Sequence, residues 1–187
     1  MLSTILKNQT KEAHQSLEAV VVKRIKSIRS KDEYVALLHK FYGFHFPMEK
    51  KYDQFFSDNS IPFYSKRRKA DLILHDLDEL GMNNKTILLA DHLPLIDSID
   101  DAFGSYYVLE GSTQGGSIVA DMLIKYAGLT PATTSFFNVY GDQKKEMWQS
   151  FKEKMDASVA SQSFDKTVAA ANSTFDLFKQ WMSTPNP

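Results

Sequence analysis

The sequence contains no cysteine among its 187 residues. This absence excludes disulfide bonds, thiolate nucleophiles, iron–sulfur clusters and cysteine-based zinc sites, and it is compatible with a reducing cytoplasm. Charges of the two signs nearly balance at a net charge of −1, so bulk electrostatics does not favour nucleic acid or an anionic membrane as a partner. No apolar run approaches the roughly 20 residues of a membrane-spanning helix, and the first seven residues lack the apolar region of a signal peptide. We therefore expect a cytoplasmic protein that binds neither nucleic acid nor membrane.

Strand-forming patterns are scarce as well, because Val, Ile and Thr are too scattered to give alternating strands. Helical periodicity dominates instead, and 187 residues of 43% hydrophobic content are enough for one domain with a substantial core. We predict an all-α fold, a single-domain multi-helix bundle over residues 1–183, with residues 184–187 as a disordered tail. The expected helices cover about residues 2–27, 31–55, 65–80, 84–91, 97–127, 142–160 and 163–182.

A few residues indicate where these helices begin, bend or end. Ser30 and Glu33 have the spacing of a capping box. Pro47 is expected to kink or break the second helix, because proline cannot donate the backbone hydrogen bond that a helix requires. Gly81 and Gly128 suit the left-handed residue that often follows a helix. Residues 129–140 are expected to hold a turn and a short helix.

A histidine motif lies on the first predicted helix, where His14 is followed four residues later by Glu18. This spacing places both side chains on one face of a helix. A neutral imidazole is a good axial ligand for iron in a porphyrin, and its second nitrogen usually donates to a carboxylate or carbonyl that fixes its orientation. The alternative is an exposed helix pair with no ligand. The spacing alone is a weak signal, because His75 has carboxylates at the same separations.

A glycine motif lies within the long predicted helix over 97–127, where Gly111, Gly115 and Gly116 occur within six positions. Each glycine costs a helix about 1 kcal/mol relative to alanine, so three of them require a reason. One explanation is close packing between helices. The other is a kink that brings the backbone against a planar ligand, with peptide N–H groups and the Ser112 hydroxyl available to bound oxygen or water.

Other common site motifs are missing from the sequence. It has no Glu-x-x-His pair for a carboxylate-bridged di-iron bundle. It also has no His-Glu-x-x-His zinc motif and no Gly-rich phosphate loop followed by Lys-Ser/Thr. Ser, His and Asp are present, but no nucleophile elbow is. The histidine and glycine motifs therefore remain as the candidates.

Together, and in this order, the two motifs resemble the heme oxygenase family, especially its soluble, biliverdin-producing bacterial branch. The segments that carry the resemblance are 6–18, 106–116 and 147–155, and it extends over nearly the whole chain. It implies that His14 is the iron ligand and acts in catalysis, with Glu18 supporting it. It also implies a kinked distal helix, in which Gly111, Ser112 and Gly115 are catalytic. The further heme-binding residues that it implies are Lys7, Lys11, Tyr106, Gly116 and Lys152.

The sequence departs from the family pattern at two positions. Ser112 stands where the animal enzymes have an aspartate that orders water near bound dioxygen, although bacterial relatives with a Glu-Gly-Ser pattern resemble this chain. Trp148 stands where a second basic residue is expected near Lys152, with Lys144 and Lys145 as candidates to replace its charge. Basic clusters such as 66–69 are expected to be solvated faces, with a docking surface for an acidic electron donor as the other interpretation.

The resemblance implies an enzyme that uses heme as both cofactor and substrate. It would open the ring to biliverdin, carbon monoxide and ferrous iron, with dioxygen and electrons from an external donor protein such as a ferredoxin or a NADPH-dependent reductase. One alternative is a heme-binding or heme-transfer protein of the same fold without ring opening. A thiamin-degrading relative would need a cysteine nucleophile, which this chain lacks. A structural bundle whose glycines only pack helices predicts no hemin binding.

Overall fold

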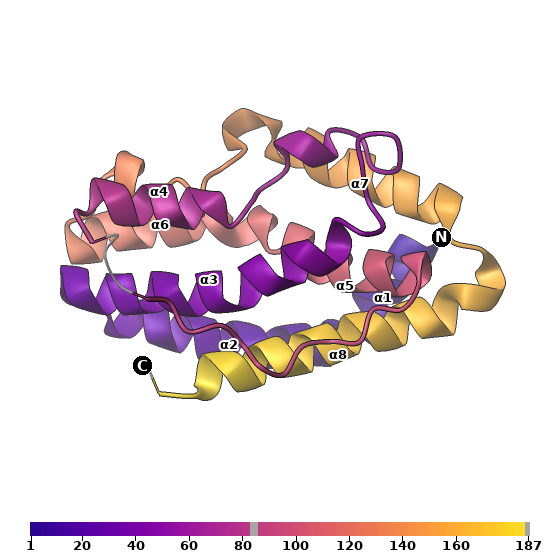
Figure 1. The fold of residues 1–187 in the computed structure, drawn as a ribbon, viewed down its shortest axis with the longest axis horizontal. Coiled ribbons are helices and arrows are strands. Elements are labelled where there is room, and N and C mark those ends of the chain that lie inside the picture. The colour runs from indigo at the N-terminus through magenta and orange to yellow at the C-terminus, as the bar shows by residue number, and fades with distance from the viewer. Residues whose placement is uncertain (83–85, 186–187) are drawn as a thin grey trace.

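The computed structural model describes residues 1–82 and 86–185, and within these ranges the chain is helical with no strand (Figure 1). The predicted all-α class is therefore confirmed. The elements in order are α1 (Leu2–Gln9), α2 (Lys11–Ser27), α3 (Lys31–Tyr52), η1 (Tyr64–Lys66), α4 (Asp71–Glu79), α5 (Ile99–Gly111), α6 (Thr113–Ala127), η2 (Pro131–Thr133), η3 (Gly141–Gln143), α7 (Lys144–Ser158), η4 (Ser161–Ser163) and α8 (Phe164–Ser183).

Two of the predicted helices are each divided in two. The helix predicted over 2–27 is interrupted at Thr10, whose buried hydroxyl donates to the Leu6 carbonyl oxygen at 2.8 Å and so competes with the helical backbone. The helix predicted over 97–127 is interrupted at Ser112, which separates α5 from α6. Ser112 keeps helical dihedral angles of φ −63° and ψ −21°. The predicted kinked helix is therefore a junction of two helices rather than one continuous element.

The middle of α3 shows why Pro47 does not end that helix. Pro47 lacks the N–H that would bond to the carbonyl of Gly43. That carbonyl accepts a hydrogen bond from the backbone N–H of Ala90 at 2.9 Å instead, so it stays satisfied and α3 continues to Tyr52. A Cβ atom at position 43 would overlap the carbonyl oxygen of Leu88, so glycine is required for this close approach. Of the kink or break predicted at Pro47, the break is therefore wrong.

Two further predicted helices differ from the structure. In the helix predicted over 84–91, residues 86–91 are not helical. Residues 84 and 85 lie outside the described ranges. The N–H of Ala90 bonds to α3 rather than to its own segment, which excludes a local helix there. The helix predicted over 65–80 is replaced by η1 and α4, because Arg67 has extended dihedral angles of φ −73° and ψ 161°.

Predicted helix ends are borne out at several positions. The capping box is present, with the Glu33 N–H donating to Ser30 Oγ at 3.3 Å. Gly81 and Gly128 have positive φ angles of 67° and 66°, as expected after α4 and α6. The predicted disordered tail begins at Thr184, which is held by hydrogen bonds from the Arg24 guanidinium and the Lys40 ammonium. Residues 186–187 of that tail lie outside the described residues.

The arrangement of the helices is set by α5 and α8, which pack closely against each other. A Cβ atom at Gly104 of α5 would overlap the Thr167 carbonyl oxygen of α8, so the two backbones touch. Helix α2 also lies along α8, and α6 contacts both α2 and α7 (Figure 1). The core between these helices is rich in fully buried aromatic residues: Tyr34, Phe44, Tyr52, Phe103, Phe136 and Phe151. No helix within the described ranges has the length and apolar character to cross a membrane.

Candidate functional site

His14 lies on α2 with an exposed side chain. Its ring packs edge-to-face on Phe175 of α8, with 5.7 Å between ring centroids and an interplanar angle of 78°. Glu18 is also exposed, and no hydrogen bond joins it to His14. An aromatic contact from α8, rather than the predicted carboxylate, therefore orients this imidazole, and the ring remains available to a ligand.

Helix α6, which follows the α5–α6 junction, contacts α2. Gly115 and Ser112 are exposed there, and Gly111 is half-buried. A Cβ atom at Gly115 would meet nothing within 4 Å, so this backbone faces open space. A Cβ atom at Gly111 would lie 3.3 Å from the Trp148 ring, so that indole already covers part of the first glycine. A flat ligand could therefore approach the backbone most closely at Gly115.

Gly116 serves a different purpose from Gly115. It is buried, and a Cβ atom there would overlap the carbonyl oxygen of Phe137. Only glycine permits this approach of α6 to the segment that follows η2. Of the two explanations for the glycine motif, close packing accounts for Gly116 and an open backbone surface accounts for Gly115.

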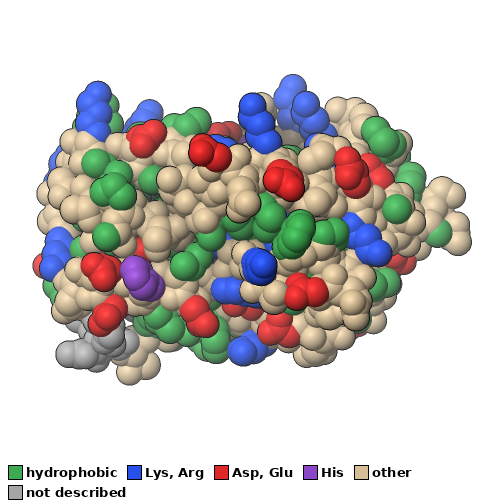
Figure 2. Space-filling model, turned by 90° about the horizontal axis from the view of Figure 1, so that it is seen from above, with side chains coloured by type: hydrophobic (Ala, Val, Ile, Leu, Met, Phe, Trp, Pro, Cys, Tyr) green, Lys and Arg blue, Asp and Glu red, His purple; other side chains and the backbone are tan. Residues whose placement is uncertain are grey.

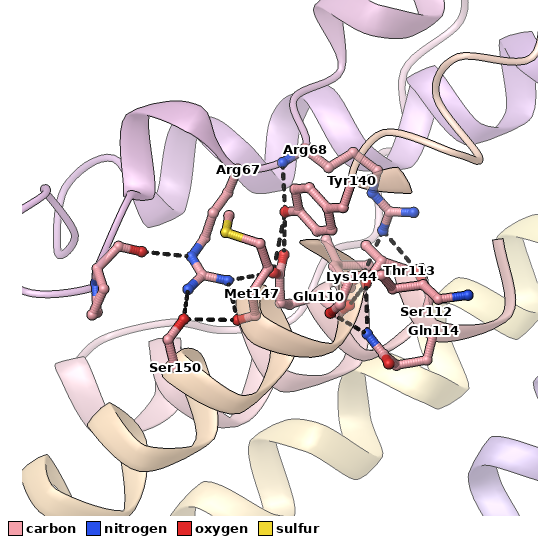
Figure 3. Close-up of polar contacts among 12 residues, drawn as sticks. Arg67, Arg68, Glu110, Ser112, Thr113, Gln114, Tyr140, Lys144, Met147 and Ser150 are labelled. Carbon is pink, nitrogen blue, oxygen red and sulfur yellow. Dashed lines mark hydrogen bonds and ion pairs between the residues drawn. The ribbon is translucent and has the colours of Figure 1, made fainter. Parts of the chain in front are cut away.

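A buried ion pair lies behind the junction, between Arg67 and Glu110 (Figure 3). Their side chains are 0% and 2% exposed. The Arg67 guanidinium also donates to the Pro62 carbonyl oxygen at 3.1 Å, to the Met147 carbonyl oxygen at 3.0 Å and to Ser150 Oγ at 3.0 Å. Arg67 thus ties α5 to α7 and to the loop before η1.

The neighbouring Arg68 holds the junction itself (Figure 3). Its guanidinium donates to the Leu109 carbonyl oxygen and, at 2.6 Å, to Ser112 Oγ, and it lies over the Phe136 ring at 4.6 Å. Its backbone N–H donates to the Tyr140 hydroxyl at 2.8 Å, and that hydroxyl donates to the Glu110 carboxylate at 3.1 Å. The solvated face predicted for residues 66–69 is therefore wrong at the two arginines, which are buried.

A signal for these arginines was present in the sequence. Glu110 is the single acidic residue in the apolar segment 102–111, and a buried carboxylate needs a cationic partner. Any solvated basic surface around them is limited to Lys66 and Lys69. The molecule seen from above carries acidic and basic side chains mixed together, with hydrophobic ones gathered near the middle (Figure 2).

The Ser112 hydroxyl is largely engaged within the protein. It donates to the Leu109 carbonyl oxygen at 2.7 Å and accepts from Arg68. A hydroxyl has one donor and two acceptor lone pairs, so one lone pair remains for a further donor. Ser112 is therefore placed to accept a hydrogen bond from water or a ligand, and its own proton is already used.

The residues expected to contact heme carboxylates occupy varied positions. Lys7 and Lys11 are exposed, and Lys152 is half-buried with its ammonium 5.6 Å from the Trp148 ring centroid. Tyr106 is buried, and its hydroxyl has no hydrogen-bond partner among the described residues. The structure thus brings Lys152 next to the glycine motif through Trp148, whereas it turns Tyr106 inward.

Lys144 is one of the candidates to replace the charge that is missing at Trp148. It lies four residues before Trp148, on the same face of α7. Its ammonium donates to Ser117 Oγ at 2.8 Å, and its carbonyl oxygen accepts from the Gln114 side chain at 3.2 Å. Lys145 beside it is exposed. Lys144 therefore fastens the start of α7 to α6.

An exposed histidine on α2, in contact with the glycine-bearing helix α6 of an all-α fold, fits a helical heme-binding protein. The family model for heme oxygenase matches residues 1–86 and 95–184. The chain therefore belongs to the heme oxygenase family.

Solved structures agree with this assignment at the level of the fold. Heme oxygenase from Neisseria meningitidis, solved with NO and CO bound, is 19% identical with a TM-score of 0.83, over 100% of this chain and 96% of that one. Heme oxygenase-1 from the cyanobacterium Synechocystis, in complex with heme, is 19% identical with a TM-score of 0.79, over 97% and 90%. The Leptospira interrogans heme oxygenase is 22% identical with a TM-score of 0.74, over 97% and 98%. No curated protein sequence matches this chain.

Proposed function

We propose that this protein is a heme oxygenase that converts heme to biliverdin, carbon monoxide and ferrous iron. The reaction consumes dioxygen and electrons from an external donor protein, such as a ferredoxin or a NADPH-dependent reductase. The observation that carries the proposal is the exposed imidazole of His14 on α2, next to the helix α6 whose backbone is open at Gly115. Family membership supports the same reaction.

The residues on these two helices fit heme as a ligand. The exposed imidazole of His14 would hold the heme iron through a ring nitrogen, and heme would supply the iron chemistry that activates dioxygen. The open space at Gly115 is what a planar macrocycle requires beside a helix backbone. Glu18 lies one helical turn from His14 and can accept from its second nitrogen after a side-chain rotation.

The distal side contributes position and hydrogen bonding. Gly115 and Gly111 keep side chains away from the ligand, and Gly116 fixes α6 through its packing on Phe137. The free lone pair of Ser112 would accept a hydrogen bond from a water, and that water would be held where it can donate a proton to the oxygen substrate. Ser112 therefore orients the donor and does not itself supply the proton.

The carboxylates of heme would meet basic side chains at the rim of the site. We assign this role to Lys7, Lys11 and Lys152, with Tyr106 as a further candidate that would have to turn outward from its buried position. Trp148 covers the rim between Gly111 and Lys152 as an apolar wall. A single domain over residues 1–183 and a cytoplasmic location complete the proposal.

The test is hemin titration of the purified protein, followed by ascorbate or a ferredoxin system in air with catalase present. Loss of the Soret band with growth of the broad biliverdin band is expected. A Soret band that forms and persists with every donor would support a heme carrier instead. Absence of any Soret complex would overturn the proposal.

The matched variants are His14→Ala and His75→Ala, because both histidines are exposed and lie on helices with nearby carboxylates. His14→Ala should weaken hemin binding and abolish turnover until imidazole is added, whereas His75→Ala should behave as the parent protein. Equal Soret spectra in the two variants would remove His14 from the site.

A further inference from the structure

A small, partly open pocket of about 10 Å³ lies between α3 and α5. That volume is close to the space that one water molecule needs. The residues that line it and enter the argument are His45 and Glu49 of α3, Arg68, and Tyr106 and Glu110 of α5. The cavity therefore contacts the same Arg68 that holds the α5–α6 junction.

Two polar atoms of the cavity lining are buried and without a hydrogen-bond partner among the described residues. They are Nε2 of His45 and the hydroxyl oxygen of Tyr106. Burial and the nearby Arg68 charge hold the pKa of His45 well below its usual value, so its imidazole is neutral. Burial raises the pKa of the Tyr106 hydroxyl, so it keeps its proton. Two neutral groups that each lack a hydrogen-bond partner therefore belong to residues that line a space of about the volume of one water molecule.

Glu49 is the acidic group of the cavity that has no arginine paired to it. Glu110 is bound by Arg67, whereas Glu49 Oε1 accepts a hydrogen bond from the Ala70 backbone N–H at 2.6 Å. Burial raises the pKa of Glu49 to about 7. The charged and titratable groups facing it from the surrounding elements are Asp53, Tyr52, Tyr64, Arg68, Lys69, Asp71, Tyr42 and Tyr106.

We propose that a water molecule in this cavity links Glu49 to Arg68, His45 and Tyr106, and that Glu49 is thereby a positioning residue for the Ser112 hydroxyl. The link runs from Glu49 through the water to the Arg68 side chain, and from its guanidinium to Ser112 Oγ and the Leu109 carbonyl oxygen. Apart from the water, every group in the link belongs to the chain itself. The proposal deepens the proposed function, since Ser112 is its distal hydroxyl, but the link exists without heme.

The charge of Glu49 changes the electrostatic attraction that acts on the Arg68 guanidinium. Ionised Glu49 attracts the guanidinium towards the cavity, whereas the protonated carboxyl leaves it to its bonds at Ser112 and Leu109. Because Glu49 titrates near neutral pH, the hydrogen bond at Ser112 should weaken as pH rises through that range. The effect reaches Ser112 only through Arg68, because Glu49 lies on a different helix from the junction.

The experiment is a pH titration of the backbone amide NMR signals of residues 109–113 in the protein without hemin, between about pH 5.5 and 8.5. In the parent protein these signals should shift together with one midpoint near 7. Glu49→Gln should abolish that transition, because glutamine keeps the shape and cannot ionise. Glu79→Gln, which alters an exposed glutamate at the end of α4, should leave it unchanged. A transition that persists in Glu49→Gln would overturn the proposal.

A second variant keeps the proposal falsifiable should Glu49→Gln fold poorly. Tyr106→Phe removes only one hydroxyl from the cavity, and it should reduce the amplitude of the shifts at 109–113 by at least half while a midpoint near 7 remains. Unchanged amplitudes in Tyr106→Phe would refute the water link. These signals are read without heme, so a failure here is distinguishable from a failure to bind or degrade hemin. In the heme-loaded parent, the pH profile of turnover should carry the same midpoint and lose it in Glu49→Gln.

Discussion

Replacing Arg67 by methionine should lower the free energy of unfolding by about 3–5 kcal/mol, the usual cost of removing one partner of a buried ion pair. The change deletes the guanidinium and keeps an unbranched stem of similar reach. The reason lies with Glu110, which is 2% exposed and, within the described part of the chain, would keep only the Tyr140 hydroxyl as a donor. A buried carboxylate without its cation is the costly product of the mutation.

The other lost bonds of Arg67 should contribute less. Ser150 Oγ already donates to the Met147 carbonyl oxygen at 3.0 Å, so that carbonyl stays satisfied. The Pro62 carbonyl oxygen lies at a partly buried position, where water can replace the guanidinium. The predicted cost therefore follows mainly from the uncompensated charge of Glu110, and removing that charge should recover part of it.

The assay is urea unfolding of the heme-free protein by circular dichroism, analysed by linear extrapolation. The double variant Arg67→Met/Glu110→Leu should be more stable than Arg67→Met alone by about 2 kcal/mol, because apolar replacement of both partners of a buried pair is often nearly neutral. A cost below about 1 kcal/mol for Arg67→Met would refute the reasoning. So would a double variant whose loss equals the sum of the two single losses.

Three other predictions follow from the same structure. Gly116→Ala should destabilise the fold by about 1–3 kcal/mol in urea unfolding, because its new methyl group overlaps the Phe137 carbonyl oxygen. Gly115→Ala should instead stabilise it by up to about 1 kcal/mol, since nothing lies near the added methyl group and alanine favours helix; a loss of stability there would contradict the open-surface interpretation. The raised pKa of Glu49, about 7 when folded and 4.5 as the ordinary value, means that the folded state binds the extra proton between these limits. Stability should therefore fall as pH rises from about 4.5 to 7, by at most about 3 kcal/mol, and Glu49→Gln should remove this dependence in urea titrations at several pH values.

Much of the fold could be predicted from local sequence. Helical periodicity gave the class, and the Ser30–Glu33 capping box, Gly81 and Gly128 marked helix ends, because each acts through contacts within a few residues. The interruption at Thr10 could not be predicted in this way. It depends on a side-chain bond to the Leu6 carbonyl oxygen, for which threonine in a helix has only a moderate tendency.

Contacts between distant segments account for the remaining differences. Arg67 and Arg68 belong to a run of four basic residues that looks solvated, and only the fold shows that Glu110 and the α5–α6 junction lie against them. Tertiary pairing decides their burial. The candidate site stays a prediction from the two motifs, and the structure adds that α2, which carries His14, contacts α6, which carries Gly115. The different roles of Gly115, which faces open space, and Gly116, which packs on Phe137, could be found only from the structure.

The hydrogen bond from Ala90 to Gly43 bears on how the long connection between α4 and α5 is closed. Residues 86–98, which precede α5, contain no helix, and the entropy cost of closing such a loop grows with its length. The Gly43 carbonyl, which Pro47 leaves without its usual helical donor, accepts the Ala90 N–H and so attaches these residues to α3. Pro47 thus leaves the Gly43 carbonyl able to accept a backbone hydrogen bond from a distant segment of the chain. The chain is consequently tethered to α3 nine residues before the start of α5, the helix that ends at Gly111.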